Sequence, residues 1–580
     1  MIKKLAKSVR EYNTPTILTV VLIIGEVFLE ILIPFITANL VNGIKASSPM
    51  SEVVSIGIKL LVMALISLIC GAAAGYTCSR ASSGFAKNLR HDIFDRIQHF
   101  SFENIDKFSE ASLVTRMTTD ISNVQMAFMM IIRTAIRAPL MIIFSVIMAF
   151  KMGGKLALTF VVIIPVLGAG LSLIAKYAMP AFRAVFKKYD KLNESIEENV
   201  RAMRVVKGFA REDFEKQKFN TASDNIRNDF TKAERIVAIN TPLMQFCMYF
   251  NMIFVYAVGS RMIILSRGSV IDVGQLAAMT TYGVQVLMSL MMVGAIYVIL
   301  TMSAESARRI AEVLDEGSAI VNPENPVMEV KDGSVVFQDV AFKYNKKARK
   351  NALFDIDLDI KSGMTVGILG GTGSGKTTLI QLIPRLYDVT HGYVKVGGVD
   401  VRDYDLDTLR NAVSVVLQKN LLFAGTIKEN LRWGNENASD EEIIEACKLA
   451  QADEFINDMP DKYDTFIEQG GTNVSGGQKQ RLCIARALLK KPKILILDDS
   501  TSAVDMKTDA LIRKGFKSFI PETTKFIIAQ RVASVEDADL IVVLHNGKIL
   551  AKGTHEELME TCDVYRETYE QQTSGGDFDD

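Results

Sequence analysis

Six long apolar runs in the first 305 residues of this 580-residue chain limit the folds open to it. Each is long enough to cross a bilayer, which takes about 20 helical residues. They lie near residues 16–42, 53–79, 126–150, 156–178, 242–266 and 275–302. The pattern predicts an α-helical polytopic membrane domain over residues 1–305 with six transmembrane helices.

The connections between the runs predict the orientation of this domain. Long polar stretches follow the second and fourth runs, at about 80–125 and 179–241, and the other links are short. The second long stretch holds 13 basic residues, whereas no short link holds more than two. The positive-inside rule therefore places the long stretches and both termini in the cytoplasm of a multi-pass plasma-membrane protein. Their helical periodicity predicts helices that extend well below the membrane and turn through short crossing helices.

The second half of the chain has a different pattern. A charged linker with Pro, Asn and Gly punctuation is expected at 306–327, an α/β domain at 328–570 and a disordered tail at 571–580. Residues 1–327 carry a net +8 and the remainder a net −8, without a concentrated basic stripe. This distribution argues against a nucleic-acid partner.

A glycine-rich loop follows a strand-like run in MTVGILGGTGSGKTTL. Gly370, Gly375, Lys376 and Thr377 match the phosphate-binding pattern G-x-x-x-x-G-K-[ST], in which backbone N–H groups cradle phosphate at a helix N-terminus. Lys376 is expected to neutralise the β- and γ-phosphates, and Thr377 to bind Mg²⁺. A plain glycine-rich turn is the alternative, but a suitable acid lies downstream. Asp498 ends the buried run ILILDD and is expected to hold Mg²⁺ through water.

A second anion site is predicted between these two motifs. In NVSGGQKQR, Ser475, Gly476 and Gly477 open a helix that continues as QKQRLCIARALLKK. One nucleotide does not need two γ-phosphate cradles in one chain, because a helix N-terminus already provides one. The sequence therefore predicts a dimer in which each signature closes on the phosphate loop of the other chain.

Together these motifs resemble the ATP-binding cassette exporters, in which six membrane helices precede a nucleotide-binding domain. The resemblance covers almost the whole chain and implies ATP and Mg²⁺ as ligands. It implies that Tyr344 stacks on adenine and that Gln418 reaches the Mg²⁺ and γ-phosphate region. It also places crossing helices near Ser112–Asp120 and Val200–Phe209. IEQGG would touch those helices, and Ser502–Asp505 would link the two ATP sites. The full set of expected nucleotide residues is Tyr344, Gly370, Gly371, Thr372, Gly373, Ser374, Gly375, Lys376, Thr377, Thr378, Gln418, Ser475, Gly476, Gly477, Gln478 and Asp498.

Two positions depart from the family pattern. Asp499 stands where the family has its catalytic glutamate, and Gln530 stands where it has a histidine. Asp is shorter than Glu by about 1.5 Å, and a misplacement of about 1 Å can cost on the order of 10²-fold in rate. Binding residues are intact while both hydrolytic residues are altered, which predicts the slow-site subunit of a heterodimer. Its partner, a homologous half-transporter, should carry Glu and His at these positions; a slow homodimer is the alternative.

The membrane half contains four charged residues at helical spacing: Glu26 and Glu30 in the first run, Arg133 and Arg137 in the third. Acids inside a membrane are rare and usually face partners or a cavity. One interpretation is a structural Glu–Arg network, another is an acidic cavity that favours cationic cargo, and a third is snorkelling of these side chains to the lipid interface. By resemblance, the cargo is an amphipathic drug-like compound, with peptide, lipid or siderophore as alternatives. A non-pumping ATP-gated channel or regulator is the alternative from another class.

Overall fold

The computed structural model describes residues 2–345, 348–499 and 506–574. The chain divides into two compact units. The first contains residues 1–99 and 109–316, and the second contains residues 100–108 and 317–580. Each unit has a hydrophobic core of its own, and each is described separately.

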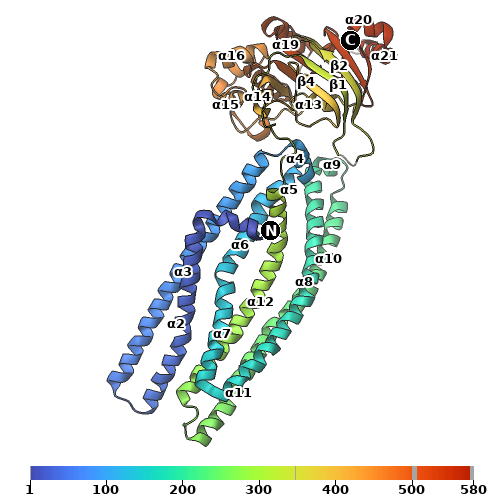
Figure 1. Ribbon diagram of the computed structural model, residues 1–580. Coiled ribbons are helices and arrows are strands. Elements are labelled where there is room, and N and C mark those ends of the chain that lie inside the picture. Colours follow the sequence, from blue (N-terminus) through green and yellow to red (C-terminus); the bar gives the residue numbers. More distant parts are fainter. Residues whose placement is uncertain (1, 346–347, 500–505, 575–580) are drawn as a thin grey trace. The chain divides into compact units, whose positions relative to one another are not determined.

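The first unit is entirely helical over its described residues (Figure 1). Its elements are α1 Ile2–Ala6, η1 Lys7–Tyr12, α2 Asn13–Lys45, α3 Met50–Gln98, α5 Glu110–Thr115, η2 Arg116–Asp120, α6 Ile121–Ile132, α7 Thr134–Gly153, η3 Gly154–Ala157, α8 Leu158–Arg201, α9 Met203–Gly208, α10 Glu212–Ala238, α11 Asn240–Ser266 and α12 Val273–Asp315. At 1.5 Å per residue, the 49 residues of α3 span about 73 Å, more than twice the ~30 Å hydrocarbon thickness.

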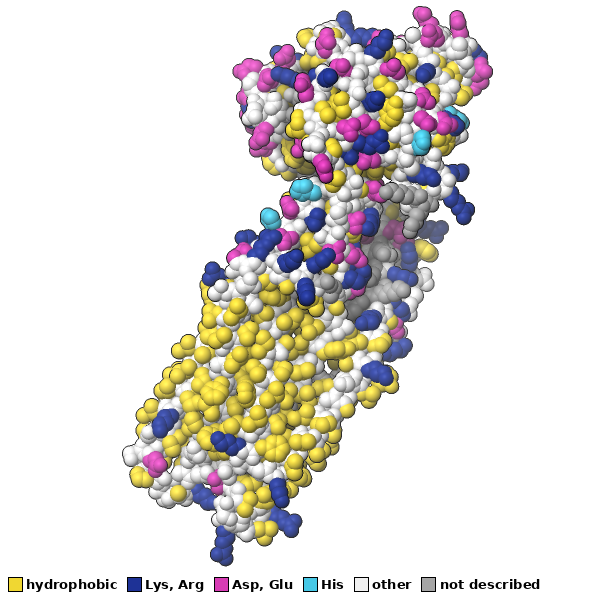
Figure 2. Space-filling model, viewed as in Figure 1, with side chains coloured by type: hydrophobic (Ala, Val, Ile, Leu, Met, Phe, Trp, Pro, Cys, Tyr) yellow, Lys and Arg dark blue, Asp and Glu magenta, His cyan; other side chains and the backbone are white. Residues whose placement is uncertain are grey.

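Each of the six apolar runs lies within these helices. Five helical stretches are long and apolar enough to cross a membrane, and one of them, 110–185, contains both the third and the fourth run. The non-helical backbone of Gly154 separates those two runs (φ 51°, ψ −121°). Figure 2 shows hydrophobic side chains covering much of the visible face of this unit, with Lys and Arg toward its ends. This distribution is what a lipid-facing helical domain requires.

The first predicted crossing helix was misplaced. Ser112–Asp120 lies in α5 and η2, which lead directly into the third apolar run. The short helix that follows α3 is instead α4, Phe102–Phe108, and it belongs to the second unit. Tyr387 donates a hydrogen bond to Asp106 (2.8 Å), and the Asn104 side chain donates to the carbonyl of Gly317 (3.1 Å). Periodicity continues across the 100–109 turn, so sequence alone did not locate this break. The second short helix, α9, was placed correctly.

The linker and tail boundaries also differ from the prediction. The first part of the expected linker, residues 306–315, is the end of helix α12, which reaches Asp315. The last described helix, α21, extends to Ser574, so residues 571–574 of the expected tail are helical, while 575–580 lie outside the described residues.

The second unit has an α/β architecture. A six-stranded sheet has the order β12-β11-β3-β10-β9-β6, a four-stranded sheet has the order β2-β1-β4-β5, and β7 pairs with β8. The strands are β1 Val335–Phe342, β2 Leu353–Ile360, β3 Thr365–Leu369, β4 His391–Val396, β5 Val399–Asp400, β6 Val413–Val416, β7 Gly425–Thr426, β8 Phe466–Ile467, β9 Ile494–Asp498, β10 Thr524–Ile528, β11 Leu540–His545 and β12 Lys548–Gly553. The remaining helices are α13 Lys376–Gln381, α14 Leu406–Ala412, α15 Ile427–Arg432, α16 Asp440–Leu449, α17 Asp453–Asn457, α18 Gly476–Leu489, α19 Met506–Phe519, α20 His555–Thr561 and α21 Asp563–Ser574, with 3₁₀ turns η4 Lys462–Asp464, η5 Gln469–Gly471 and η6 Val532–Ser534.

The parallel strands of the larger sheet position the site. β3, β10, β9 and β6 are successive parallel neighbours, and β3, β10 and β9 are fully buried. The loops that leave their carboxyl ends therefore meet at one edge of the sheet, where ligands bind in open α/β sheets. These loops carry the four groups that the sequence singles out: the glycine-rich loop, Gln530, Asp498–Asp499 and Gln418.

Candidate nucleotide site

The phosphate-binding loop runs from the end of β3 to the start of α13. Gly370 has φ 151°, and a Cβ there would lie 2.2 Å from the carbonyl oxygen of Leu544, so only glycine is accommodated. A Cβ at Gly371 or Gly373 would meet nothing within 4 Å, so the outer side of the loop is open. The Lys376 ammonium donates to the carbonyls of Gly370 (2.7 Å) and Gly371 (2.9 Å) and thereby lies across the loop.

The residues expected to hold Mg²⁺ converge as predicted. The Thr377 hydroxyl donates to the Asp498 carboxylate at 3.0 Å, and Asp498 is buried at the end of β9. Burial raises the pKa of Asp498, and the neighbouring Asp499 charge raises it further, against the hydrogen bond from Thr377 and the charge of Lys376. Burial also lowers the pKa of Lys376, although both aspartates oppose this shift. One hydroxyl and one carboxylate beside a phosphate cradle form an oxygen donor set that fits Mg²⁺.

The two residues that depart from the family pattern, Asp499 and Gln530, contact each other. The side-chain amides of Gln418 (3.1 Å) and Gln530 (3.0 Å) both donate to the same oxygen, Oδ2 of Asp499. The Asp499 backbone is left-handed (φ 48°), and its N–H donates to the carbonyl of Ile528 on β10 (3.0 Å). Asp tolerates this backbone region better than most residues, because its short polar side chain can hydrogen-bond to nearby backbone groups.

The adenine and signature residues occupy separate parts of the unit. Tyr344 packs edge-on against Tyr387 (ring centroids 5.2 Å apart), and its hydroxyl lies 2.9 Å from that of Thr378. Burial raises the Tyr344 pKa. Ser475 is the N-cap of α18: its hydroxyl accepts from the Gln478 N–H (3.3 Å), and its own N–H donates to the Gln478 side chain (2.9 Å). Ser475 and Gly476 are exposed, so the start of this helix is accessible to another chain. The Ser502–Asp505 loop lies outside the described residues.

The charged residues of the membrane half form a network across helices. Arg137 on α7 contacts Glu26 (2.5 Å) and Glu30 (2.8 Å), both on α2. Glu26 is buried beneath Gly71 of α3, where a Cβ would lie 3.0 Å from its carboxylate. These contacts favour the structural-network interpretation. Arg133 lies at the break between α6 and α7 and makes no ion pair among the described residues.

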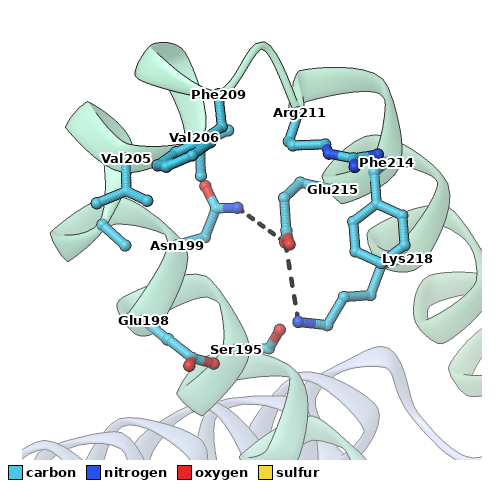
Figure 3. A pocket seen from close by; sticks show the side chains of 11 residues that line it. Ser195, Glu198, Asn199, Val205, Val206, Phe209, Arg211, Phe214, Glu215 and Lys218 are labelled. Atoms are coloured by element: carbon cyan, nitrogen blue, oxygen red, sulfur yellow. Dashed lines mark hydrogen bonds and ion pairs between the residues drawn. The ribbon is translucent and has the colours of Figure 1, made fainter.

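The second long polar stretch, at about 179–241, contains a pocket of about 520 Å³ between α8, α9 and α10 (Figure 3). Asn199 donates to Glu215 (2.9 Å) at its centre, and Lys218 approaches the same carboxylate (3.8 Å). Val205 of α9 and Phe209, which follows the helix as its C-cap, are strongly exposed. An exposed apolar helix of this kind is typical of a contact surface.

Comparisons with known proteins agree with this architecture. Two family models match: the ABC transporter transmembrane region at residues 16–290 and the ABC transporter domain at residues 353–502. The chain is 34% identical over 571 residues to the uncharacterized ABC transporter ATP-binding protein YfiB of Bacillus subtilis, covering 98% of both chains. This chain belongs to the ABC transporter family. It is an ATP-hydrolysing transporter with its membrane and nucleotide-binding parts fused in one chain.

Two further similarities support the assignment. An uncharacterized ABC transporter ATP-binding protein of Mycobacterium tuberculosis is 32% identical over 568 residues, which cover 97% of each chain. The solved structure of a bacterial Atm1-family ABC exporter with ATP bound has a TM-score of 0.82 at 21% identity, over 97% of this chain and 98% of that one. That likeness shows a common fold.

Proposed function

We propose that this ABC transporter chain is the slow-site subunit of a heterodimeric exporter of amphipathic small molecules in the cytoplasmic membrane. The observation that carries the proposal is the double hydrogen bond to Oδ2 of Asp499. One of the two carboxylate oxygens that could accept a proton from the attacking water already accepts hydrogen bonds from Gln418 and Gln530. The carboxylate is also about one C–C bond shorter than that of glutamate.

The remaining residues of the site suit binding. Lys376 and the open loop cradle the phosphates of ATP, the Thr377–Asp498 pair holds Mg²⁺, and Tyr344 stacks on the base. Bound Mg²⁺ supplies charge neutralisation at the β- and γ-phosphates. The exposed Ser475–Gln478 helix start completes the hydrolytic site on the Walker residues of the partner, a homologous half-transporter with Glu and His. ATP-driven closure of the two nucleotide domains would be carried to the membrane helices by α4 and α9, and transport would follow alternating access.

The double variant Asp499→Glu/Gln530→His tests the slow-site assignment. We expect ATP turnover by the full-length chain, purified alone in detergent, to rise by roughly 10²-fold, because a carboxylate would reach the attacking water and an ionisable group would stand beside it. Adding Lys376→Ala should remove the gained activity, which shows that it comes from this site.

A measurement on the unmodified chain can contradict the slow-site proposal. If it hydrolyses ATP alone, as a homodimer, at tens of turnovers per second, near the enzyme median of about 10 s⁻¹, it has no slow site and needs no partner. Export of a panel of amphipathic cations and neutral compounds by the co-expressed pair tests the cargo class.

A further inference from the structure

The C-terminal helix α21 reaches back to the segment that carries Gln530. The Gln572 side chain accepts a hydrogen bond from the N–H of Val532 (2.8 Å) and donates one to the carbonyl of Gln530 (3.0 Å). The two backbone groups belong to the turn between β10 and η6, where the sheet ladder has ended. One side-chain amide therefore pairs with both, as a neighbouring strand would.

The chemistry of these contacts defines the amide orientation. An N–H can only donate and a carbonyl can only accept, so the Gln572 oxygen must face Val532 and its nitrogen must face Gln530. A glutamate or a hydrocarbon at this position could make at most one of the two bonds. The arrangement is therefore specific for an amide of this length.

Gln572 joins α21 to the Gln530–Val532 turn by direct hydrogen bonds. A pocket of about 280 Å³ separates Thr568 and Tyr565 of α21 from Gly370 and Gly371 of the phosphate-binding loop, and Gln530 also lines it. Tyr565 is buried, and its hydroxyl bonds to His555 (2.7 Å), so α21 is anchored to α20. On the other side of the turn, the N–H of Ala529 donates to the carbonyl of Ile368 on β3 (3.3 Å). The turn is thus held between the central sheet and Gln572.

We infer that Gln572 is a positioning residue for Gln530, holding the backbone from which the Gln530 side chain reaches Asp499 and the γ-phosphate region. The inference rests on the proposed nucleotide site and adds that Gln530, through its contact with Asp499, acts on the γ-phosphate end of that site. A shift of the carbonyl of Gln530 moves its amide away from Oδ2 of Asp499, to which it now donates (3.0 Å). The C-terminal helix thereby acts on the discrimination between ATP and ADP without touching the nucleotide.

The test compares the affinities of the full-length chain for ATP and for ADP, each with Mg²⁺, by displacement of a fluorescent ATP analogue. We expect Gln572→Ala to weaken ATP binding by about 5-fold, the effect of losing a hydrogen bond, and to leave ADP binding unchanged. Gln572→Glu keeps the acceptor for Val532 and loses only the donor to Gln530, so it should act in the same direction even if Ala loosens α21. Gln571→Ala, an exposed neighbour, is the matched control.

A double-mutant cycle separates positioning from general stability. In a Gln530→Ala background, Gln572→Ala should no longer change the ratio of ATP to ADP affinity. The inference is overturned if Gln572→Ala weakens ATP and ADP equally, or acts equally in both backgrounds. If Gln530→Ala itself leaves the ratio unchanged, the proposed role of Gln530 fails and the inference fails with it. A Gln530 effect without a Gln572 effect overturns the inference alone.

Discussion

At the scale of single residues, the site buries ionisable groups, and burial of a charged group costs free energy. Asp498 is buried beside a second carboxylate, and its pKa is raised for that reason. A raised carboxyl pKa means that the folded state binds the proton more tightly than the unfolded state. Stability therefore falls as the pH rises from the unfolded pKa through the folded pKa, because the buried group must then ionise.

Asp498→Asn should consequently stabilise the nucleotide-free chain while weakening its response to Mg²⁺ and ATP. The stability gained over the unmodified protein should grow as the pH rises through the Asp498 pKa. ATP with Mg²⁺ at 100 times the dissociation constant should stabilise the unmodified protein by about 2.7 kcal/mol, and the variant by much less. The sequence contains a single tryptophan, Trp433, which lies in the nucleotide-binding unit, so its fluorescence follows unfolding of that unit.

Asp359→Asn makes the same charge change at an exposed position on β2 and serves as the control. Equal stability changes in the two variants, or a full response of Asp498→Asn to Mg²⁺, would show that Asp498 is not the buried Mg²⁺ residue.

At the scale of elements, ion pairs join helices that are distant in sequence. Arg137 ties α7 to α2 through two acids, and in a membrane interior these three charges have little access to water. A second network lies near the C-terminal end of α12. There Arg309 donates to fully buried Asp120 (2.8 Å), and Arg116 donates to the carbonyl of Arg309 (2.7 Å). Asp120 and Arg116 belong to a π-helical turn, a rare geometry that is frequent at functional positions.

Arg137→Met should destabilise the full-length chain by about 3–5 kcal/mol, because it leaves two partly buried acids without their cation. The triple variant Arg137→Met/Glu26→Gln/Glu30→Gln should recover most of the loss, since no uncompensated charge remains. Thermal unfolding of the purified protein in detergent gives the measurement, and Arg133→Met is the matched control. A cavity role for the acids, rather than a structural one, would instead leave stability unchanged and selectively reduce the export of cations.

At the scale of the whole molecule, the proposed hydrolytic site is shared between chains. Ser475 and Gly476, at the start of α18, are exposed. A cap residue contributes about 1 kcal/mol to its helix, and the same capping box occurs at Ser439 on α16. Ser439 is therefore a second serine cap among the described residues, and of the two only Ser475 is proposed to face a partner.

Ser475→Arg should reduce ATP hydrolysis by the co-expressed pair on the order of 10²-fold, because it displaces the helix start from the partner's γ-phosphate. ATP binding by this chain's own loop should remain. Ser439→Arg removes an equivalent cap and should cost stability without this loss of turnover. If both variants retain hydrolysis, or both lose it equally, the signature is not part of a composite site.

Local sequence patterns determined the kinds of elements in this protein and the chemistry of its nucleotide site. The apolar runs, the glycine-rich loop, the acids after a buried strand and the substitutions Asp499 and Gln530 are all short-range features. Their structural consequences follow from helix and strand periodicity and from the chemistry of phosphate binding. The Asn-Gly turn in HNGK is another short-range feature: it joins β11 and β12, which pair with His545 opposite Lys548.

Only the tertiary structure decided which distant groups meet. Arg137 pairs with Glu26, 111 positions away, and Gln572 pairs with Gln530, 42 positions away. Nothing in the spacing of either residue names its partner, because such contacts depend on how helices and strands pack in space. The same holds for α4, which belongs to the second unit. Its Asp106 accepts a hydrogen bond from Tyr387, 281 positions away. Sequence by itself determined which chemistry the chain carries, whereas packing decided how its buried charges are compensated and which segment holds Gln530 in place.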